Sequence, residues 1–290
     1  MRIPGLGRIN KKLSTYLGNE RKSSFEKFIN SAEFKADLNK TLIAKSRVNL
    51  EIVTFTNSIG FPDLILSILS FINSTGLPSK WTIYADDNFT AEQRNVLNAF
   101  EFIVYQKWYA NISAVDREKY NSRWQFRKYL CLSTHMINTT TVFIDSDVLF
   151  YNQFNKYKEF VKESNWYLPE PIEAFSIDQE ITKREDYKLN MYIINSGIMI
   201  LNKMPPWNLG KQYLAECLTK NSITHFTEQS AVNIVYANDS HARILEPRVF
   251  HVSTSDHFKF GFFKTNELAM RHYVGLVRHK MWQAGWKQFI

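Results

Sequence analysis

An apolar run that ends in two aspartates constrains the fold of this chain more than any other feature. Residues 141–150 read Thr-Val-Phe-Ile-Asp-Ser-Asp-Val-Leu-Phe, with carboxylates at Asp145 and Asp147. An unbroken apolar stretch rich in β-branched and aromatic residues is typical of a strand buried on both faces. Two carboxylates at its carboxyl end are costly to desolvate unless a cation accompanies them. Spaced i and i+2 in extended backbone, they point the same way and could together hold a divalent cation, which prefers oxygen ligands.

A structural interpretation of the same tripeptide is equally open. Aspartates at a strand end can fix a turn through local hydrogen bonds, and a D-x-D sequence is short and common. The choice between a metal–diphosphate site and a turn therefore depends on the rest of the chain.

Composition and charge narrow the class of protein. The 290 residues are 44% hydrophobic and 22% charged, which fits a globular chain with one large α/β domain or two modest ones. A formal net charge of +8 suggests an acidic partner, such as nucleic acid, an anionic membrane or a phosphate-bearing small molecule. We expect no nucleic-acid partner, because the chain has no long Lys/Arg run and no zinc-finger spacing. Cys131 and Cys217 form no C-x-x-C pair, which agrees with a reducing compartment.

Strand and helix patterns alternate along the first half of the chain. Strands are expected at residues 50–56, 81–84, 102–105 and 141–144, with helices at 61–72, 91–100 and 123–136. This alternation predicts a mainly parallel sheet flanked by helices. The longest apolar stretch, residues 61–72, is far shorter than the ~20 residues that span a bilayer, and no signal peptide is recognisable.

The remaining segments divide the chain as follows. Residues 1–48 are predicted to form a basic helical arm, which packs on the main domain or touches a membrane surface. Residues 49–290 are predicted to form a single domain. Within it, residues 151–190 are expected to be a loop-rich insertion on the acceptor side, and residues 247–290 a carboxyl-terminal phosphate- and metal-binding segment.

Polar residues follow three of the predicted strands. Asn57, the Asp86-Asp87 pair, Asp145 and Asp147 would all lie at the carboxyl edge of the sheet. Open parallel α/β sheets bind ligands beyond that edge. A carboxylate after the second strand could accept hydrogen bonds from the base or ribose of a nucleotide, although Asp86-Asp87 alone would be read as a polar turn.

Three further motifs occur in the second half. Asn195-Ser196-Gly197 lies between two apolar runs, where glycine lets backbone approach a ligand, or where it marks a bulge or turn. Glu228-Gln229 opens a predicted helix, where an acid could also simply complement the helix dipole. His272 offers a metal-capable imidazole a few residues before Arg278 and Lys280, cations suited to phosphate.

Taken in order, these motifs resemble the glycosyltransferases of the GT-A fold, and within them the family 8-like retaining enzymes related to glycogenin and bacterial lipopolysaccharide galactosyltransferases. The resemblance covers roughly residues 50–285. It rests on Asp86-Asp87, Arg127, Phe143-Ile144-Asp145-Ser146-Asp147, Asn195-Ser196-Gly197-Ile198-Met199-Ile200-Leu201-Asn202, Glu228-Gln229-Ser230-Ala231-Val232-Asn233 and His272-x-x-Gly275 with Trp282.

The chain departs from the family pattern at three places. The family's D-Q-D-x-x-N appears here with two changes, at Glu228 and Ser230. Arg278 takes the position of the family lysine by count, yet the segment from Lys280 to Trp282 looks like the family's K-P-W shifted by two, so the phosphate cation stays open between Arg278 and Lys280. The long segment before residue 50 also differs, and a related GT-A family is an alternative.

The resemblance implies a GT-A, Rossmann-like mixed sheet and a metal-dependent transfer of a hexose or related sugar from a nucleotide-diphospho-sugar, with UDP favoured and configuration retained. It implies Mn²⁺ or Mg²⁺ held by Asp145, Asp147 and His272. The catalytic candidates are Asn195, Glu228 and Gln229. The donor-binding candidates are Thr56, Asn57, Asp86, Asp87, Arg127, Asp145, Ser146, Gly275, Arg278 and Lys280.

The expected acceptor is a glycan or a lipid-linked molecule, as in polysaccharide or lipopolysaccharide biosynthesis. The expected location is the cytoplasm, with peripheral contact to an anionic inner membrane. The alternatives are an inverting GT-A transferase, a phosphatase of the haloacid dehalogenase type in which the first Asp is a nucleophile, a nucleotidyltransferase, and a non-enzymatic basic module that binds membranes or nucleic acid.

Overall fold

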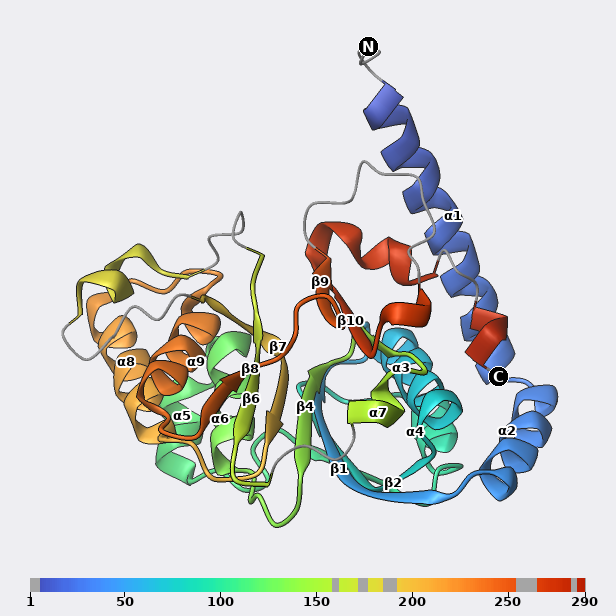
Figure 1. The fold of residues 1–290 in the computed structure, drawn as a ribbon, viewed down its shortest axis with the longest axis horizontal. Coiled ribbons are helices and arrows are strands. Elements are labelled where there is room, and N and C mark those ends of the chain that lie inside the picture. The colour runs from blue at the N-terminus through green and yellow to red at the C-terminus, as the bar shows by residue number, and fades with distance from the viewer. Residues whose placement is uncertain are drawn as a thin grey trace.

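The computed structural model describes residues 6–157, 162–171, 177–184, 192–253, 265–282 and 286–289, which form an α/β structure (Figure 1). The strands of its central sheet are β1 (Arg47–Thr56), β2 (Leu77–Ala85), β3 (Ile103–Lys107), β4 (Thr141–Asp145), β6 (Asn165–Pro169), β7 (Ile194–Leu201) and β8 (Ala242–Ile244). Within the described residues their order is β3-β2-β1-β4-β7-β6-β8. Strands β3, β2, β1 and β4 run parallel, whereas β7 is antiparallel to both β4 and β6. The mixed, mainly parallel sheet predicted from the sequence is therefore confirmed.

Helices cover both faces of this sheet (Figure 1). One layer contains α3 (Phe61–Ser74) and α4 (Ala91–Leu97), and the other contains α5 (Ala114–Tyr120), α6 (Trp124–Thr134), α8 (Trp207–Lys220) and α9 (Thr227–Asn238). The two layers explain why β4 is buried at every position before its last residue, Asp145. Val142 and Ile144 face the core around α3, while Phe143 between them faces the core around α6 and α9.

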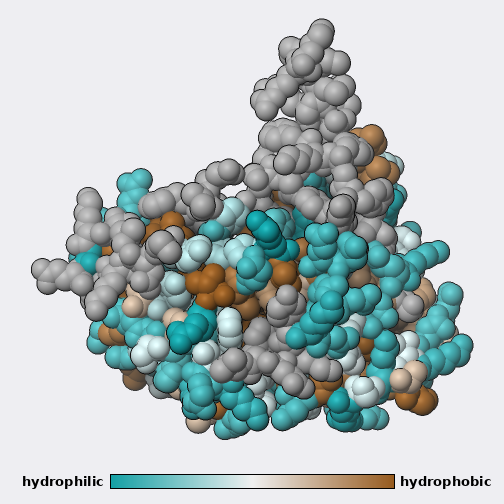
Figure 2. All heavy atoms as spheres, viewed as in Figure 1, coloured by the Kyte–Doolittle hydropathy of each residue, from teal (hydrophilic) through white to brown (hydrophobic). Residues whose placement is uncertain are grey.

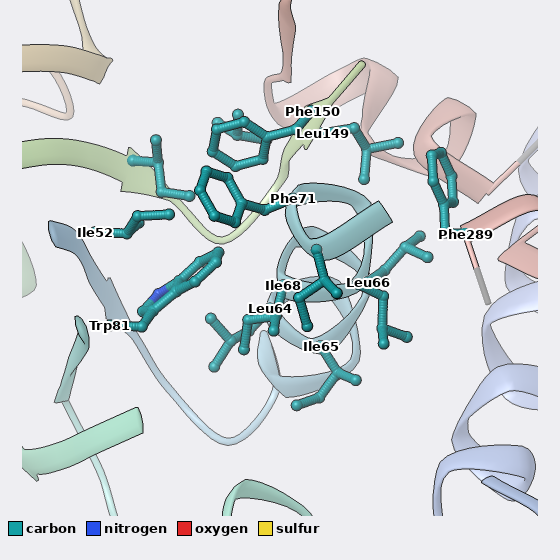
Figure 3. Close-up of a cluster of buried hydrophobic side chains, with 14 of the residues drawn as sticks. Ile52, Leu64, Ile65, Leu66, Ile68, Phe71, Trp81, Leu149, Phe150 and Phe289 are labelled. Atoms are coloured by element: carbon teal, nitrogen blue, oxygen red, sulfur yellow. The ribbon is translucent and has the colours of Figure 1, made fainter. Parts of the chain in front are cut away.

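Helix α3 is the centre of the first core. It begins with Phe61-Pro62, where proline suits the first helical turn, and it is buried along nearly its whole length. Its side chains lie between Ile52 and Trp81 of the central sheet and the small second sheet beyond (Figure 3). Phe289, close to the carboxyl terminus, reaches the same cluster (Figure 3).

A second sheet forms from strands far apart in the sequence, β5 (Val148–Phe150), β9 (Phe250–Ser253) and β10 (Met270–Tyr273). Strand β10 lies in the middle, antiparallel to β5 and parallel to β9. The register pairs His272 with Val148, and the Tyr273 amide donates a 2.9 Å hydrogen bond to the Asp147 carbonyl oxygen. This sheet therefore brings the carboxyl-terminal segment against the residues that follow β4.

The amino-terminal arm consists of α1 (Leu6–Ile29) and α2 (Ala32–Ala44), and Ser31 caps the second helix by accepting a hydrogen bond from the Phe34 amide. Phe25, Ile29 and Phe34 are buried in the core around α3. The Phe25 ring packs 5.3 Å from that of Trp282, in the 3₁₀ helix η4 (Gly275–Trp282). The packing of the arm on the rest of the molecule, one of its two expected roles, is thus visible in the structure.

Residues 151–190 hold more regular structure than their sequence pattern predicts. Their described residues include α7 (Phe154–Tyr157), strand β6 of the central sheet and the 3₁₀ helix η1 (Gln179–Lys183). Strand β6 was not predicted because its apolar run is only Trp166-Tyr167-Leu168, which is too short to show the alternation of a strand. Two further 3₁₀ helices are η3 (Thr265–Glu267) and η5 (Trp286–Phe289). Hydrophilic side chains dominate the face seen in Figure 2, with a small hydrophobic group near its centre over β7 and β10.

Candidate active site

Three predicted metal ligands meet beyond the carboxyl end of β4. Asp145 ends that strand, Asp147 follows it in a turn, and His272 approaches from β10. One ligand atom from each lies within 4.8 Å of the others. His272 Nε2 lies 3.1 Å from Asp147 Oδ1 and 3.5 Å from Asp145 Oδ2. The convergence expected from the i, i+2 spacing is present, and the second sheet supplies the third ligand.

Hydrogen bonds fix which nitrogen of His272 faces the carboxylates. Asn195 Nδ2 donates to Glu170 Oε1 at 2.6 Å, so the amide oxygen of Asn195 must point the other way. That oxygen accepts from the Gly197 amide at 2.8 Å and lies 2.8 Å from His272 Nδ1. Nδ1 therefore carries a proton, and Nε2 is the atom directed at Asp145 and Asp147.

Gly197 makes this approach of the imidazole possible. A Cβ at this position would lie 2.1 Å from Cε1 and 2.3 Å from Nδ1 of His272. Any side chain would push the ring away from the carboxylates. The sequence predicted that Gly197 lets the backbone approach a bound ligand. In the structure, Gly197 instead makes room for the imidazole of His272, a candidate metal ligand.

The charges around Asp147 make it strongly acidic. Its side chain is almost fully buried, and Arg278 contacts one of its oxygens, Oδ2, at 2.6 Å through Nη2 and at 2.7 Å through Nε. Burial alone would raise the pKa of Asp147, but His272 and Arg278 hold it well below the ordinary range. The pKa of His272 is raised, because Asp147 and Asp145 outweigh the effect of its burial. The Asp147 carboxylate is therefore ionised near neutral pH.

Lys128 is the main residue that sequence analysis missed. It lies on α6 next to the predicted Arg127, and its Nζ lies 2.8 Å from Asp145 Oδ1 and 3.5 Å from Glu228 Oε2. Burial would lower the pKa of Lys128, but Asp145 and Glu228 raise it above its ordinary value. The sequence did contain a signal for this role. Lys128 occupies an inward-facing position of a helix whose buried residues include Gln125, Phe126, Tyr129 and Leu132.

The catalytic candidates form two linked groups. Glu228 accepts a 2.9 Å hydrogen bond from the Ser196 hydroxyl, and its own burial raises its pKa despite the nearby Lys128. Asn195 and Gln229 both donate to Glu170 Oε1, at 2.6 Å and 3.1 Å. Glu170 directly follows β6 and was not predicted. These side chains come from β7, from the first turn of α9 and, for Glu170, from the residue after β6.

A cleft of about 280 Å³ opens beside the metal ligands. Its lining comes from the loops after β1, β2 and β4, from α6 and from the two ends of the chain: Lys22, Phe55, Thr56, Asn57, Ile59, Gly60, Asp63, Asp86, Trp124, Lys128, Asp145, Ser146, Asp147 and Arg278. The carboxyl edge of the sheet is therefore hollowed where the topology predicts a ligand site.

Asp86 and Arg127 form an ion pair at this edge. Arg127 Nε lies 2.5 Å from Asp86 Oδ1, and Nη2 donates to Oδ2 at 2.9 Å. Asp87 is engaged in the loop after β1, because it accepts hydrogen bonds from the amide and hydroxyl of Ser58 at 2.7 Å and 2.5 Å. Asn57 similarly accepts from the Gly60 amide. Asp86 lines the cleft, whereas Asp87 shapes the loop.

Four of the predicted donor-binding residues lie outside the cleft lining, namely Asp87, Arg127, Gly275 and Lys280. Lys280 is buried, whereas Arg278 lines the cleft and contacts Asp147, so the geometry favours Arg278 as the cation beside the metal ligands. Gly275 begins η4 with a φ of +39°, in an open position where it permits the turn out of β10. A larger cleft of about 860 Å³ lies at the opposite edge of the sheet, around Asn49 and Thr140, far along both strands from the carboxylates.

The site fits a hard divalent cation. Two carboxylates and an imidazole nitrogen converge, and the buried Asp147 Oδ1 lies 3.1 Å from His272 Nε2 without a well-aligned hydrogen bond among the described residues. With Nδ1 bonded to Asn195, either a proton or a metal ion must lie at Nε2 for the three groups to approach so closely. The donor set of oxygens and one nitrogen suits Mn²⁺ or Mg²⁺.

Comparison with known proteins shows the fold. No protein-family model matches the chain, and no curated protein sequence matches it. The galactosyltransferase LgtC, solved with donor and acceptor sugar analogues, superposes with a TM-score of 0.52 at 13% identity, over 82% of this chain and 93% of that one. The apo form of the glycosyltransferase GlyE of Streptococcus pneumoniae TIGR4 gives a TM-score of 0.55 at 12% identity, over 83% and 62%. The bifunctional glycosyltransferase WbbM gives 0.53 at 14% identity, over 78% and 46%. The chain thus has the GT-A fold of these glycosyltransferases, as the sequence resemblance predicted.

Proposed function

We propose that the protein is a metal-dependent glycosyltransferase that uses a nucleotide-diphospho-sugar donor. The observation that carries this proposal is the convergence of Asp145, Asp147 and His272 beside a cleft at the carboxyl edge of a GT-A sheet. LgtC, a structure of the same fold, was solved with donor and acceptor sugar analogues. Buried carboxylates, a cleft and flanking cations together match the needs of a donor that carries a diphosphate.

Asp145, Asp147 and His272 would hold Mn²⁺ or Mg²⁺. The ion, when bound, supplies Lewis-acid stabilisation of the leaving diphosphate. Arg278 now occupies Asp147 Oδ2, and competition from a cation for that oxygen would free the guanidinium for a phosphate oxygen. Lys128 keeps Asp145 in place and holds a positive charge at the cleft wall.

The sugar would lie toward Asn195, Gln229 and Glu170. Glu170 Oε2 is buried and has no hydrogen-bond partner among the described residues, so it can accept from a sugar hydroxyl. Gln229 lies beside it, and in a transfer that retains configuration its side chain would stabilise positive charge at the anomeric carbon. We favour retention because the motif order resembles retaining enzymes, and the anomeric configuration of the product, read by NMR, tests it.

At the other end of the cleft, Asp86 would accept hydrogen bonds from the base or ribose, oriented by Arg127. A UDP-sugar remains the favoured donor on the strength of the motif resemblance. Glu170, which belongs to the segment 151–190, lies beside Gln229, and this segment would contribute to recognition of a glycan or lipid-linked acceptor.

A peripheral contact with an anionic membrane also has an observation in its favour. Leu13, Tyr16 and Leu17 are exposed on α1, in a segment that carries Arg8 and Lys12. Among the described helices, none is both long and apolar enough to cross a bilayer. A cytoplasmic, membrane-peripheral location is therefore part of the proposal, and co-sedimentation with phosphatidylglycerol vesicles, weakened by Leu13→Ser/Leu17→Ser, tests it.

The decisive experiment measures donor binding and hydrolysis across UDP-, GDP- and dTDP-sugars with and without Mn²⁺. We expect one donor to bind and turn over only with metal, and Asp147→Ala to lose activity by about 10²-fold or more. Thermal unfolding of the variant shows that it is folded. If no donor binds the wild-type protein in the presence of Mn²⁺, the transferase proposal is wrong, and the haloacid dehalogenase-type phosphatase becomes the next activity to assay.

A further inference from the structure

One of the cations that line the cleft comes from the amino-terminal arm. Lys22, on the amino-terminal arm, lines the cleft together with Asp63, Asp147 and Arg278. Its Nζ lies 3.1 Å from Asp63 Oδ2, and 24% of its side chain is exposed. The arm is the part of the chain that departs from the resemblance to known transferases, so its presence at the metal site calls for an explanation.

We propose that Lys22 binds the donor diphosphate, so that the amino-terminal arm completes the active site. This inference rests on the proposed function, because it assigns a ligand to the same cleft. Lys22 would act beside Arg278, and the two residues would contact phosphate oxygens.

Asp63 holds Lys22 in position. The carboxylate lies in the first turn of α3 and is almost fully buried, with Trp282 Nε1 donating to Oδ1 at 3.0 Å and Lys22 donating to Oδ2 at 3.1 Å. Each oxygen thus has a partner. An ammonium carries three N–H donors, so one remains committed to Asp63 while the exposed part of Lys22 can offer others to a ligand.

The charge balance of the cleft supports the same assignment. Asp145 and Asp147 would be offset by the bound cation, whereas Asp63 has no metal to offset it. Without Lys22, the buried Asp63, whose pKa burial already raises, would lose its cationic partner beside the diphosphate. Lys22 therefore removes a repulsive charge from the cleft and adds hydrogen-bond donors for an anion.

The arm is seated closely on the segment that carries Arg278. A Cβ at Gly18 would lie 2.6 Å from the His279 carbonyl oxygen, so α1 touches η4 backbone to backbone. One turn further along α1, Arg21 Nη1 contacts the Trp282 carbonyl oxygen at 3.4 Å. Lys22 and Arg278 are consequently held by two packed elements and reach the cleft as a pair.

Calorimetric titration with inorganic pyrophosphate in the presence of Mn²⁺ tests this assignment without requiring the base or sugar of the donor. We expect Lys22→Met to bind pyrophosphate about tenfold more weakly than the wild type, the usual loss for a hydrogen bond to a charged group. Binding of Mn²⁺ alone should be unchanged. Lys27→Met is the matched control, because Lys27 is an exposed lysine of the same helix, and it should bind pyrophosphate as the wild type does.

A double variant separates direct contact from charge shielding. Lys22→Met/Asp63→Asn leaves the wall neutral, and we expect it still to bind pyrophosphate several-fold more weakly than the wild type, with thermal unfolding confirming that it is folded. Wild-type affinity in either Lys22 variant would overturn the assignment. Failure of the proposed function looks different: the wild-type protein itself would bind neither a nucleotide sugar nor pyrophosphate, and the role of Lys22 would fall with it.

Discussion

Two buried clusters in this protein contain the same kinds of side chain, but only one of them lies at the candidate active site. In the first, Glu51 of β1 receives Lys80 and Thr82, each 3.0 Å from Oε1, with His135 Nε2 at 3.3 Å. In the second, at the other end of the sheet, Asp145 and Asp147 meet lysine, arginine and histidine. Burial of carboxylates among cations is therefore not what marks the functional site.

What differs is whether the carboxylates are satisfied. Glu51 leaves no buried oxygen without a hydrogen-bond partner in the described part of the chain, and it does not line the cleft. Glu228 Oε1 is buried without such a partner among the same residues, and Asp147 Oδ1 is buried with the imidazole of His272 3.1 Å away, where a metal ion could replace the contact. The second cluster thus has unused ligand capacity next to an open cleft, at a cost to stability that a structural cluster has no reason to carry.

Replacing the lysine of each cluster in turn should give the largest difference in turnover between the two clusters. Lys128→Met removes the cation between Asp145 and Glu228, and we expect turnover to fall about 10²-fold, because a preorganised charge at the cleft wall is lost. Binding of Mn²⁺ should persist or tighten, since Asp145 loses its competing partner. Lys80→Met, in the Glu51 cluster, should leave turnover unchanged. Equal losses of turnover in the two variants would remove the distinction between the clusters.

A smaller effect is expected from the glycine that admits His272. Gly197→Ala places a methyl group 2.1 Å from Cε1 of the imidazole, so the ring must move, and affinity for Mn²⁺ should fall about 10- to 100-fold in a calorimetric titration. Gly210→Ala is the control, because its Cβ would lie 2.1 Å from the Tyr129 hydroxyl in the core, where the cost is stability. If Gly210→Ala weakened Mn²⁺ binding as much, a general loss of packing would explain both variants.

Most of the sheet could be predicted because its strands are either long or mainly apolar. The run at 141–144 is apolar after Thr141 and buried throughout, since both faces of β4 are covered, and the strands at 50–56 and 81–84 are also mainly apolar. Strands β6 and β8 were not predicted. Each is a short strand at the far side of the sheet, and its place depends on pairing with distant residues rather than on a local pattern.

The meeting of Asp145, Asp147 and His272 could be predicted from the sequence, whereas the hydrogen bonds and ion pairs around them could not. Asp145 and Asp147 follow from a strand end, which is local, and Asn195 and His272 from motif order. That Lys128, rather than its neighbour Arg127, reaches Asp145 depends on the rotation of α6 against the sheet. Lys22 reaches the cleft only because the two ends of the chain pack together, which no spacing within the sequence reveals.

The smallest predicted effect concerns stability alone and isolates the structural cluster. Burial would raise the pKa of Glu51, but His135 and Lys80 outweigh it and lower the pKa from 4.5 to about 2. A carboxylate whose folded pKa is depressed contributes stability above its unfolded pKa, and this contribution is lost as the pH falls through the folded value. Glu51→Gln should therefore lower the free energy of unfolding by about 1–2 kcal/mol near neutral pH, after allowance for solvent screening.

The pH dependence distinguishes charge from hydrogen bonding in that cluster. Urea unfolding of the wild type and Glu51→Gln across the interval between 4.5 and about 2 should show the difference shrinking as the pH falls, because the wild-type carboxylate becomes protonated. A difference that stays constant with pH would mean that Glu51 stabilises the fold through hydrogen bonds that an amide group cannot replace, rather than through its charge. Donor turnover near neutral pH should be the same in both proteins, since Glu51 lies outside the cleft lining. A loss of turnover in Glu51→Gln would mean that the Glu51 cluster also supports activity.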